Sequence, residues 1–79
     1  MKLRIISPNK EILNVDVSHA VFPGVKGEMD ILPGHAELVS MLANGEIKYF
    51  QTNLESKSIS IKSGLVEISN DKIVALVEM

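Results

Sequence analysis

Apolar and polar residues alternate along most of the chain, which is the period of a β-strand with two different faces. The alternating groups are Leu3/Ile5, Leu13/Val15/Val17, Ile47/Tyr49, Ile59/Ile61 and Ile73/Ala75/Val77. Short turn-forming runs of Gly, Pro, Asn, Ser and Asp separate these groups. The pattern therefore predicts many short antiparallel strands and no long helix.

One turn signal stands out. Asn44-Gly45 predicts a type I′ β-hairpin, because that turn needs two residues that tolerate positive φ. Residues 35–43 are the only helix-like run, but their brevity and the preceding Pro33-Gly34 favour a strand. About eight to ten short strands with one apolar side each share a core only in a doubled or closed sheet. The expected fold class is all-β, a sandwich or flattened barrel.

The size and composition fit a small folded domain. The 79 residues allow one domain at most, residues 1–79, and 46% of them are apolar. Only Phe22, Tyr49 and Phe50 are aromatic, so the core is expected to consist of Ile, Leu, Val, Met and Ala. A core of this kind gives a chain this short little surplus stability, and we expect a partner surface to add some.

The composition also argues against several functions. A net charge of −2 without a Lys/Arg cluster argues against nucleic-acid binding. The lack of cysteine rules out disulfides, thiolate metal sites and a cysteine nucleophile, and it fits a cytosolic protein. The sequence contains neither a signal peptide nor the roughly 18 consecutive apolar residues of a membrane-spanning helix. It is therefore not expected to cross a bilayer.

Catalytic patterns are missing as well. His19 and His35 share no metal-ligand spacing, and His19 is interpreted as a half-exposed sheet residue. The sequence has no G-x-S-x-G nucleophile turn, no P-loop and no G-x-G-x-x-G motif. We therefore expect no catalytic residue, no metal and no cofactor.

Residues 27–38 combine two glycines and a proline with a short alternating segment. On the residues alone they indicate a tight hairpin with Glu28 and Asp30 near loop edges and a sharp turn at Pro33-Gly34. A second interpretation comes from a family resemblance.

Residues 27–38 resemble the G-E-x-x-I/V-x-P-G-H-A-x-L signature in the first domain of the epsilon subunit of rotary F-type ATP synthases. Residues 44–47 resemble that family's P/N-G-x-I/V-x hairpin. Residues 63–68 resemble its S-G-G-x-x-E-V segment, with Leu65 in place of the second glycine. The three motifs occur in the family's order, and residues 3–8 resemble its opening strand, so the similarity covers essentially the whole chain.

This resemblance implies a ten-strand β-sandwich at the foot of the central stalk, in contact with the gamma subunit and the c-ring. Such a domain carries no active site and is implied to need no cofactor or small-molecule ligand. Its implied role is to turn with the rotor and to help couple proton flow to ATP synthesis. The implied location is the cytoplasmic face of the inner (cell) membrane, as a peripheral protein. Family members commonly continue into a two-helix inhibitory domain, and with the sequence ending at Met79 no such C-terminal helical domain is expected. Two explanations stay open: the subunit is naturally short, or a longer chain was trimmed to its sandwich.

The resemblance also implies contact residues. Glu28 matches the acidic position after glycine, which implies a c-ring contact at Lys26, Gly27 and Glu28. Strand alternation after Gly34 predicts an outward set of residues for the gamma subunit: His35, Val39 and Met41, with Glu37. The inward set is Ala36, Leu38 and Leu42. Two alternatives stay open, namely that both faces are buried or that a bulge turns Ser40 outward.

Two other protein classes are alternatives. Lipoyl and biotinyl carrier domains are β-sandwiches of similar length, and Asn70-Asp71-Lys72-Ile73 faintly resembles their hairpin with a modified lysine. Lys72, however, lies near the end of the sequence rather than between two similar halves. An oligonucleotide-binding barrel would need a basic groove with aromatic stacking platforms, and the charge and the few aromatics argue against it.

Overall fold

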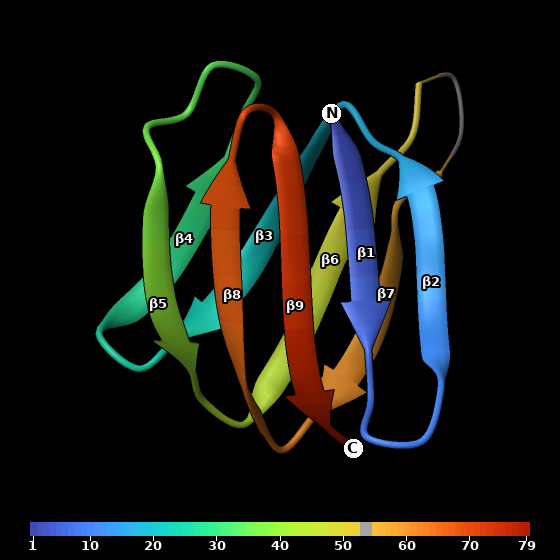
Figure 1. The fold of residues 1–79 in the computed structure, drawn as a ribbon, viewed down its shortest axis with the longest axis vertical. Helices are drawn as coiled ribbons and strands as arrows, with labels where there is room; N and C mark the ends of the chain where they lie inside the picture. Colours follow the sequence, from blue (N-terminus) through green and yellow to red (C-terminus); the bar gives the residue numbers. More distant parts are fainter. Residues whose placement is uncertain (53–54) are drawn as a thin grey trace.

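The computed structural model describes residues 1–52 and 55–79, and these form one nine-stranded sheet (Figure 1). No helix occurs within these residues. The expected all-β class is confirmed, with nine strands in the described part of the chain instead of ten. The strands are β1 (Lys2–Ile6), β2 (Glu11–Asp16), β3 (His19–Gly24), β4 (Gly27–Ile31), β5 (Leu38–Leu42), β6 (Gly45–Phe50), β7 (Lys57–Ile61), β8 (Ser63–Ser69) and β9 (Lys72–Glu78).

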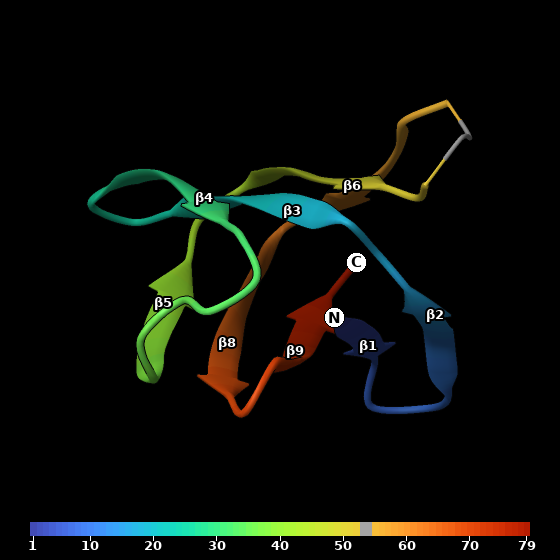
Figure 2. The same ribbon diagram turned by 90° about the horizontal axis from the view of Figure 1, so that it is seen from above.

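The sheet folds over into two layers, which Figure 2 shows one above the other. One layer has the order β2-β1-β9-β8-β5, and the other contains β3 with β4, β6 and β7. A single residue pair, Gly24 with Leu42, joins β3 to β5 and so connects the layers. We call the first layer the front layer, because it faces the viewer in Figure 1.

The first and last strands lie side by side within the front layer. β1 pairs with β9 in parallel, with Leu3 opposite Ile73. The other strand pairs are antiparallel, including β1 with β2 and β8 with β9. Both ends of the sequence are therefore held in the same layer.

Inward-pointing residues of the two layers form the core, as the period-two pattern predicts. Leu3, Ile5 and Ile73 are at most 1% exposed. The expectation of a purely aliphatic core was wrong, because Phe22 is the largest fully buried side chain and Tyr49 is also buried. Among the described residues, the buried ones are Leu3, Ile5, Val17, Ala20, Phe22, Ile31, Leu42, Ile47, Tyr49, Ile61, Val66, Ile68, Ile73, Ala75 and Val77.

The predicted hairpin at Asn44-Gly45 was also wrong. β5 pairs with β8 and β3, whereas β6 pairs with β3 and β7, so this turn carries the chain from one layer to the other. The amide next to the turn, Ala43 N–H, donates to the carbonyl of Pro23 (2.7 Å). The pair with the backbone of a type I′ turn is Asn70-Asp71, with φ of 50° and 59°, and it joins β8 to β9.

Candidate functional site

The expected c-ring contacts lie together at one end of the second layer. β4 pairs with β3, with Glu28 opposite Pro23, and the turn between these strands contains Lys26. Lys26, Gly27 and Glu28 are all exposed. Gly27 has a φ of 125°, a backbone conformation that residues with a Cβ rarely adopt. The structure thus brings the three residues together at the tip of the β3–β4 hairpin.

Residues 32–37 form a loop between β4 and β5, which we call the signature loop. A turn closes it, in which His35 N–H donates to the carbonyl of Leu32 (3.1 Å) and Gly34 has a φ of 83°. The sharp turn expected at Pro33-Gly34 is therefore present. The His35 side chain is exposed, with Nδ1 2.7 Å from the carbonyl oxygen of Ala36.

The expected strand alternation holds only from Leu38 onward. Val39 and Met41 of β5 are 61% and 63% exposed, and Leu42 is buried. Ser40 is half-buried on the inner side, so neither of the alternative arrangements occurs. The expectation that Ala36 is interior was wrong, because it lies in the signature loop before the strand begins and is exposed. His35 is in that loop too, so its position does not follow from the alternation.

Two further apolar residues extend the exposed surface of β5. Leu65 of β8 lies opposite Met41 on one side and opposite Leu76 of β9 on the other. Leu65 is 39% and Leu76 is 50% exposed. Ile6 of β1, which is half-buried, continues the line opposite Leu76. We call these four residues, Met41, Leu65, Leu76 and Ile6, the outer row, since they cross the outside of the front layer.

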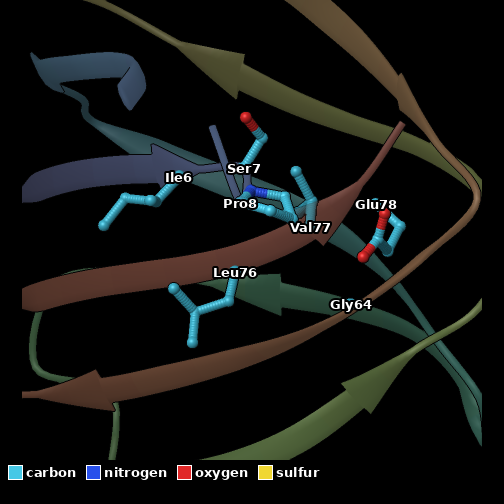
Figure 3. Close-up of a pocket in the computed structure, with 7 residues that line it drawn as sticks. All are labelled: Ile6, Ser7, Pro8, Gly64, Leu76, Val77 and Glu78. Atoms are coloured by element: carbon cyan, nitrogen blue, oxygen red, sulfur yellow. The ribbon is translucent and has the colours of Figure 1, made fainter. Parts of the chain in front are cut away.

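Two shallow depressions border the outer row. A small one of about 120 Å³ lies beside it and is lined by Val39, Leu65, Glu67, Val74 and Leu76. A larger one of about 390 Å³ lies at the end of β1, and its lining residues are labelled in Figure 3: Ile6, Ser7, Pro8, Gly64, Leu76, Val77 and Glu78. Of these described lining residues only Glu78 carries a charge. The surroundings are therefore apolar and suit a packing surface.

Sequence reasoning missed Leu65 and Leu76. Leu65 could have been found because it replaces the second glycine of the family's S-G-G-x-x-E-V segment, so that an apolar side chain stands where the pattern has no side chain. Leu76 could have been found from its position in β9, because it alternates with the buried Ile73, Ala75 and Val77 and so points to the opposite face of the strand. An outward apolar residue in a strand is visible in a sequence, whereas its alignment with others across four strands is not.

The titratable side chains are scattered. Within residues 1–52 and 55–79 there is no group of three or more His, Cys, Asp or Glu side chains that could hold a metal ion. His19 is half-buried, as expected, and its ring stacks on Phe50 with a centroid distance of 4.0 Å. Arg4 forms an ion pair with Glu11 (3.0 Å) on the surface. The described residues also include no helix with the length and apolar character needed to cross a membrane.

A family model of the ATP synthase delta/epsilon chain β-sandwich domain matches residues 1–79. The chain belongs to this delta/epsilon family. Among its curated relatives, the ATP synthase epsilon chain of a Sulfurovum species is 37% identical over 78 residues, and that of a Nitratiruptor species is 40% identical over 78 residues. Each match covers 99% of this chain, but 61% and 60% of the respective relative. The chain thus spans about three fifths of the length of these delta/epsilon relatives.

Solved structures share the delta/epsilon fold. A chain from the mitochondrial ATP synthase of Euglena gracilis, a structure of OSCP, F1 and the c-ring, superposes with a TM-score of 0.90 at 20% identity, covering 98% of this chain and 49% of that one. A chain from the central stalk and c-ring of the Tetrahymena thermophila mitochondrial enzyme has a TM-score of 0.83 at 19% identity, covering 100% of this chain and 63% of that one. Family membership also removes the carrier-domain alternative, and in the structure Asn70-Asp71 forms the hairpin turn while Lys72 begins β9.

Proposed function

We propose that residues 1–79 form the sandwich domain of a non-catalytic central-stalk subunit of a proton-translocating F-type ATP synthase. In this proposal the domain links the gamma subunit to the c-ring and supports the coupling of proton flow to ATP synthesis. It lies at the cytoplasmic face of the inner (cell) membrane, attached through the complex. Membership of the delta/epsilon family supports the assignment.

The observation that carries the partner assignment is the outer row. Exposed apolar residues scattered singly are ordinary, whereas contiguous ones mark interaction surfaces. Met41, Leu65 and Leu76 are neighbours in register on adjacent strands, and Val39 lies beside them. We assign this surface, together with His35 of the signature loop, to the gamma subunit.

We assign the tip of the β3–β4 hairpin to the c-ring. Lys26, Gly27 and Glu28 are exposed there, and Glu28 offers a carboxylate that would pair with a basic side chain on the polar loops of the ring. The hairpin lies directly beside β5, since Val25 N–H donates to the carbonyl of Met41 (3.1 Å). The hairpin tip and Met41 of the outer row therefore lie at the same end of the domain, whereas the signature loop with His35 lies at the other end of β5.

Methionine oxidation in the presence and absence of the gamma subunit tests the main assignment. Met41 is 63% exposed and Met79 is 52% exposed, so hydrogen peroxide should oxidise both in the free chain. Gamma subunit from the same organism should protect Met41 and leave Met79 reactive, as measured by peptide mass spectrometry. Equal protection of the two residues, or none, would contradict the assignment of the outer row.

For coupling, the test is reconstitution. Enzyme that lacks this subunit should regain ATP-driven proton pumping when the 79-residue chain is added. We propose no braking role for residues 1–79, so ATP hydrolysis should not be strongly suppressed by the addition. Strong inhibition that ATP relieves would overturn that part of the proposal.

A further inference from the structure

A hydrogen bond joins the signature loop to a distant turn. The backbone N–H of Gly34 donates to Oδ1 of Asp71 over 3.0 Å, and 37 residues separate the two in sequence. Gly34 is the residue whose φ of 83° turns the loop. The acceptor is a side chain at the tip of the β8–β9 hairpin, so a neighbouring strand pair holds the loop at its bend.

Asp71 is itself firmly placed. It is the second residue of the Asn70-Asp71 turn, and its φ of 59° lies in the left-handed region that Asp and Asn tolerate better than most residues. Its carbonyl oxygen accepts a hydrogen bond from Lys2 N–H of β1 (3.0 Å). The turn and β1 thus fix the backbone of Asp71. Its carboxylate is therefore well placed to accept the hydrogen bond from the signature loop.

A second contact runs in parallel. Ser69 Oγ, at the end of β8, donates to Oε2 of Glu37 over 3.3 Å. Glu37 is the last residue of the signature loop before β5 begins. The β8–β9 hairpin therefore holds the loop at two points, on either side of the exposed His35.

We propose that Asp71 is a positioning residue, which holds the signature loop in the conformation that binds the partner subunit. This inference rests on the proposed function, because His35 of this loop is assigned there to the gamma contact. Asp71 acts through the loop backbone and needs no partner contact of its own. A loop that is already ordered avoids the cost of becoming ordered on binding, so its tether contributes to affinity.

Three substitutions distinguish the effect of the Gly34–Asp71 hydrogen bond, which we call the tether, from the effect of the Asn70-Asp71 turn conformation. Asp71→Gly keeps a residue suited to positive φ and makes an Asn-Gly pair, which type I′ turns prefer, but it removes the carboxylate. Asp71→Asn keeps both the tolerance of positive φ and a side-chain oxygen that can accept from Gly34. Asn70→Gly alters the other turn residue, whose side chain makes no hydrogen bond to the loop among the described residues, and serves as the control.

Two measurements apply to each variant of the 79-residue chain. NMR hydrogen exchange of the Gly34 amide reports the tether, and calorimetric titration with gamma subunit reports binding. Asp71→Gly should raise the exchange rate roughly three- to tenfold and weaken binding by a similar factor, the range for losing one hydrogen bond. Asp71→Asn and Asn70→Gly should leave the exchange rate and the dissociation constant within about twofold of those of the original chain. Asp71→Gly should remain folded, with a melting temperature lowered by no more than several degrees, because one hydrogen bond is lost.

The outcomes distinguish this inference from the proposed function. Unchanged Gly34 exchange in Asp71→Gly would overturn the tether. Faster exchange with unchanged affinity would show that loop order does not contribute to binding and would overturn the positioning role, while the gamma contact itself stands. Failure of the original chain to bind gamma subunit would overturn the proposed function, and the exchange data would still decide whether the tether exists.

Discussion

The backbone N–H of Val25 donates to the carbonyl oxygen of Met41 over 3.1 Å, which joins the β3–β4 hairpin to the end of β5. Val25 begins the turn that contains Lys26, and Met41 belongs to the outer row. The two surfaces that we assign to different partners are therefore connected through backbone rather than through side chains. Under that assignment, a force on the hairpin tip would reach Met41 through this one backbone hydrogen bond.

The outer row predicts a defect specific to binding. Met41→Lys places a charge in the middle of the proposed gamma contact, and burying an unpaired charge is costly. We expect gamma affinity to fall by roughly tenfold or more, while the free chain keeps its stability because Met41 is exposed. Met79→Lys makes the same exchange at a similarly exposed methionine and should bind normally. Equal losses in the two variants, measured by calorimetric titration, would show that charge alone is responsible.

The hairpin tip predicts a different defect. Glu28→Lys reverses the charge of the proposed c-ring contact, and we expect weaker association with the ring and reduced proton pumping, by roughly three- to tenfold. Glu55→Lys changes the net charge by the same amount at another exposed position. Only the first variant should affect pumping in reconstituted vesicles. If both reversals behave alike, Glu28 has no specific role.

Truncating Phe22 tests how small the free energy of unfolding of the domain is. It is the largest fully buried side chain and is 0% exposed, and truncating a buried Phe to Ala typically costs about 3–5 kcal/mol. Since small domains are stable by only about 5–15 kcal/mol, Phe22→Ala should leave the chain close to unfolding at room temperature. Urea denaturation followed by circular dichroism measures the loss. Phe22→Leu, which keeps most of the apolar volume, should cost clearly less.

At Gly64, β8 and β9 lie so close together that a larger residue should destabilise the domain. A Cβ at this position would lie 2.6 Å from the carbonyl oxygen of Leu76 and 3.2 Å from Cγ1 of Val77. Gly64→Ala must therefore shift backbone, and we expect a loss of about 1–3 kcal/mol in the free energy of unfolding. Ser63→Ala, at the exposed neighbouring position, should be close to neutral. A stable Gly64→Ala variant in thermal melts would contradict this packing.

The sequence predicts strands and their faces well wherever one face is buried. Alternation places Leu3, Ile5 and Ile73 correctly, because the period of two is a property of the backbone and burial selects one face. The same reasoning places Val39 and Met41 outward once β5 begins. It fails for Ala36 because Gly34 turns the chain and the strand starts only at Leu38.

Turn chemistry is a weaker guide, because the strands that pair determine what a turn must do. Asn44-Gly45 has the residues of a hairpin, yet here it lies against Pro23, where a Cβ on Gly45 would come within 2.9 Å of the Pro23 Cβ. That glycine is needed for a close approach between segments rather than for positive φ. The hydrogen bond from Gly34 to Asp71 could not be predicted from the sequence, since it joins two residues that no local pattern relates.

The parallel pairing of β1 with β9 bears on how the protein is made. Of the described strands β1 is synthesised first and β9 last, yet the residue opposite Leu3 of β1 is Ile73 of β9. Until then β2 can cover one edge of β1, and the other edge is open to incorrect partners. Closing so long a loop makes folding slow, so the nascent chain should remain susceptible to protease until β9 emerges. Chaperone contacts during synthesis are therefore expected to concentrate on the first hairpin.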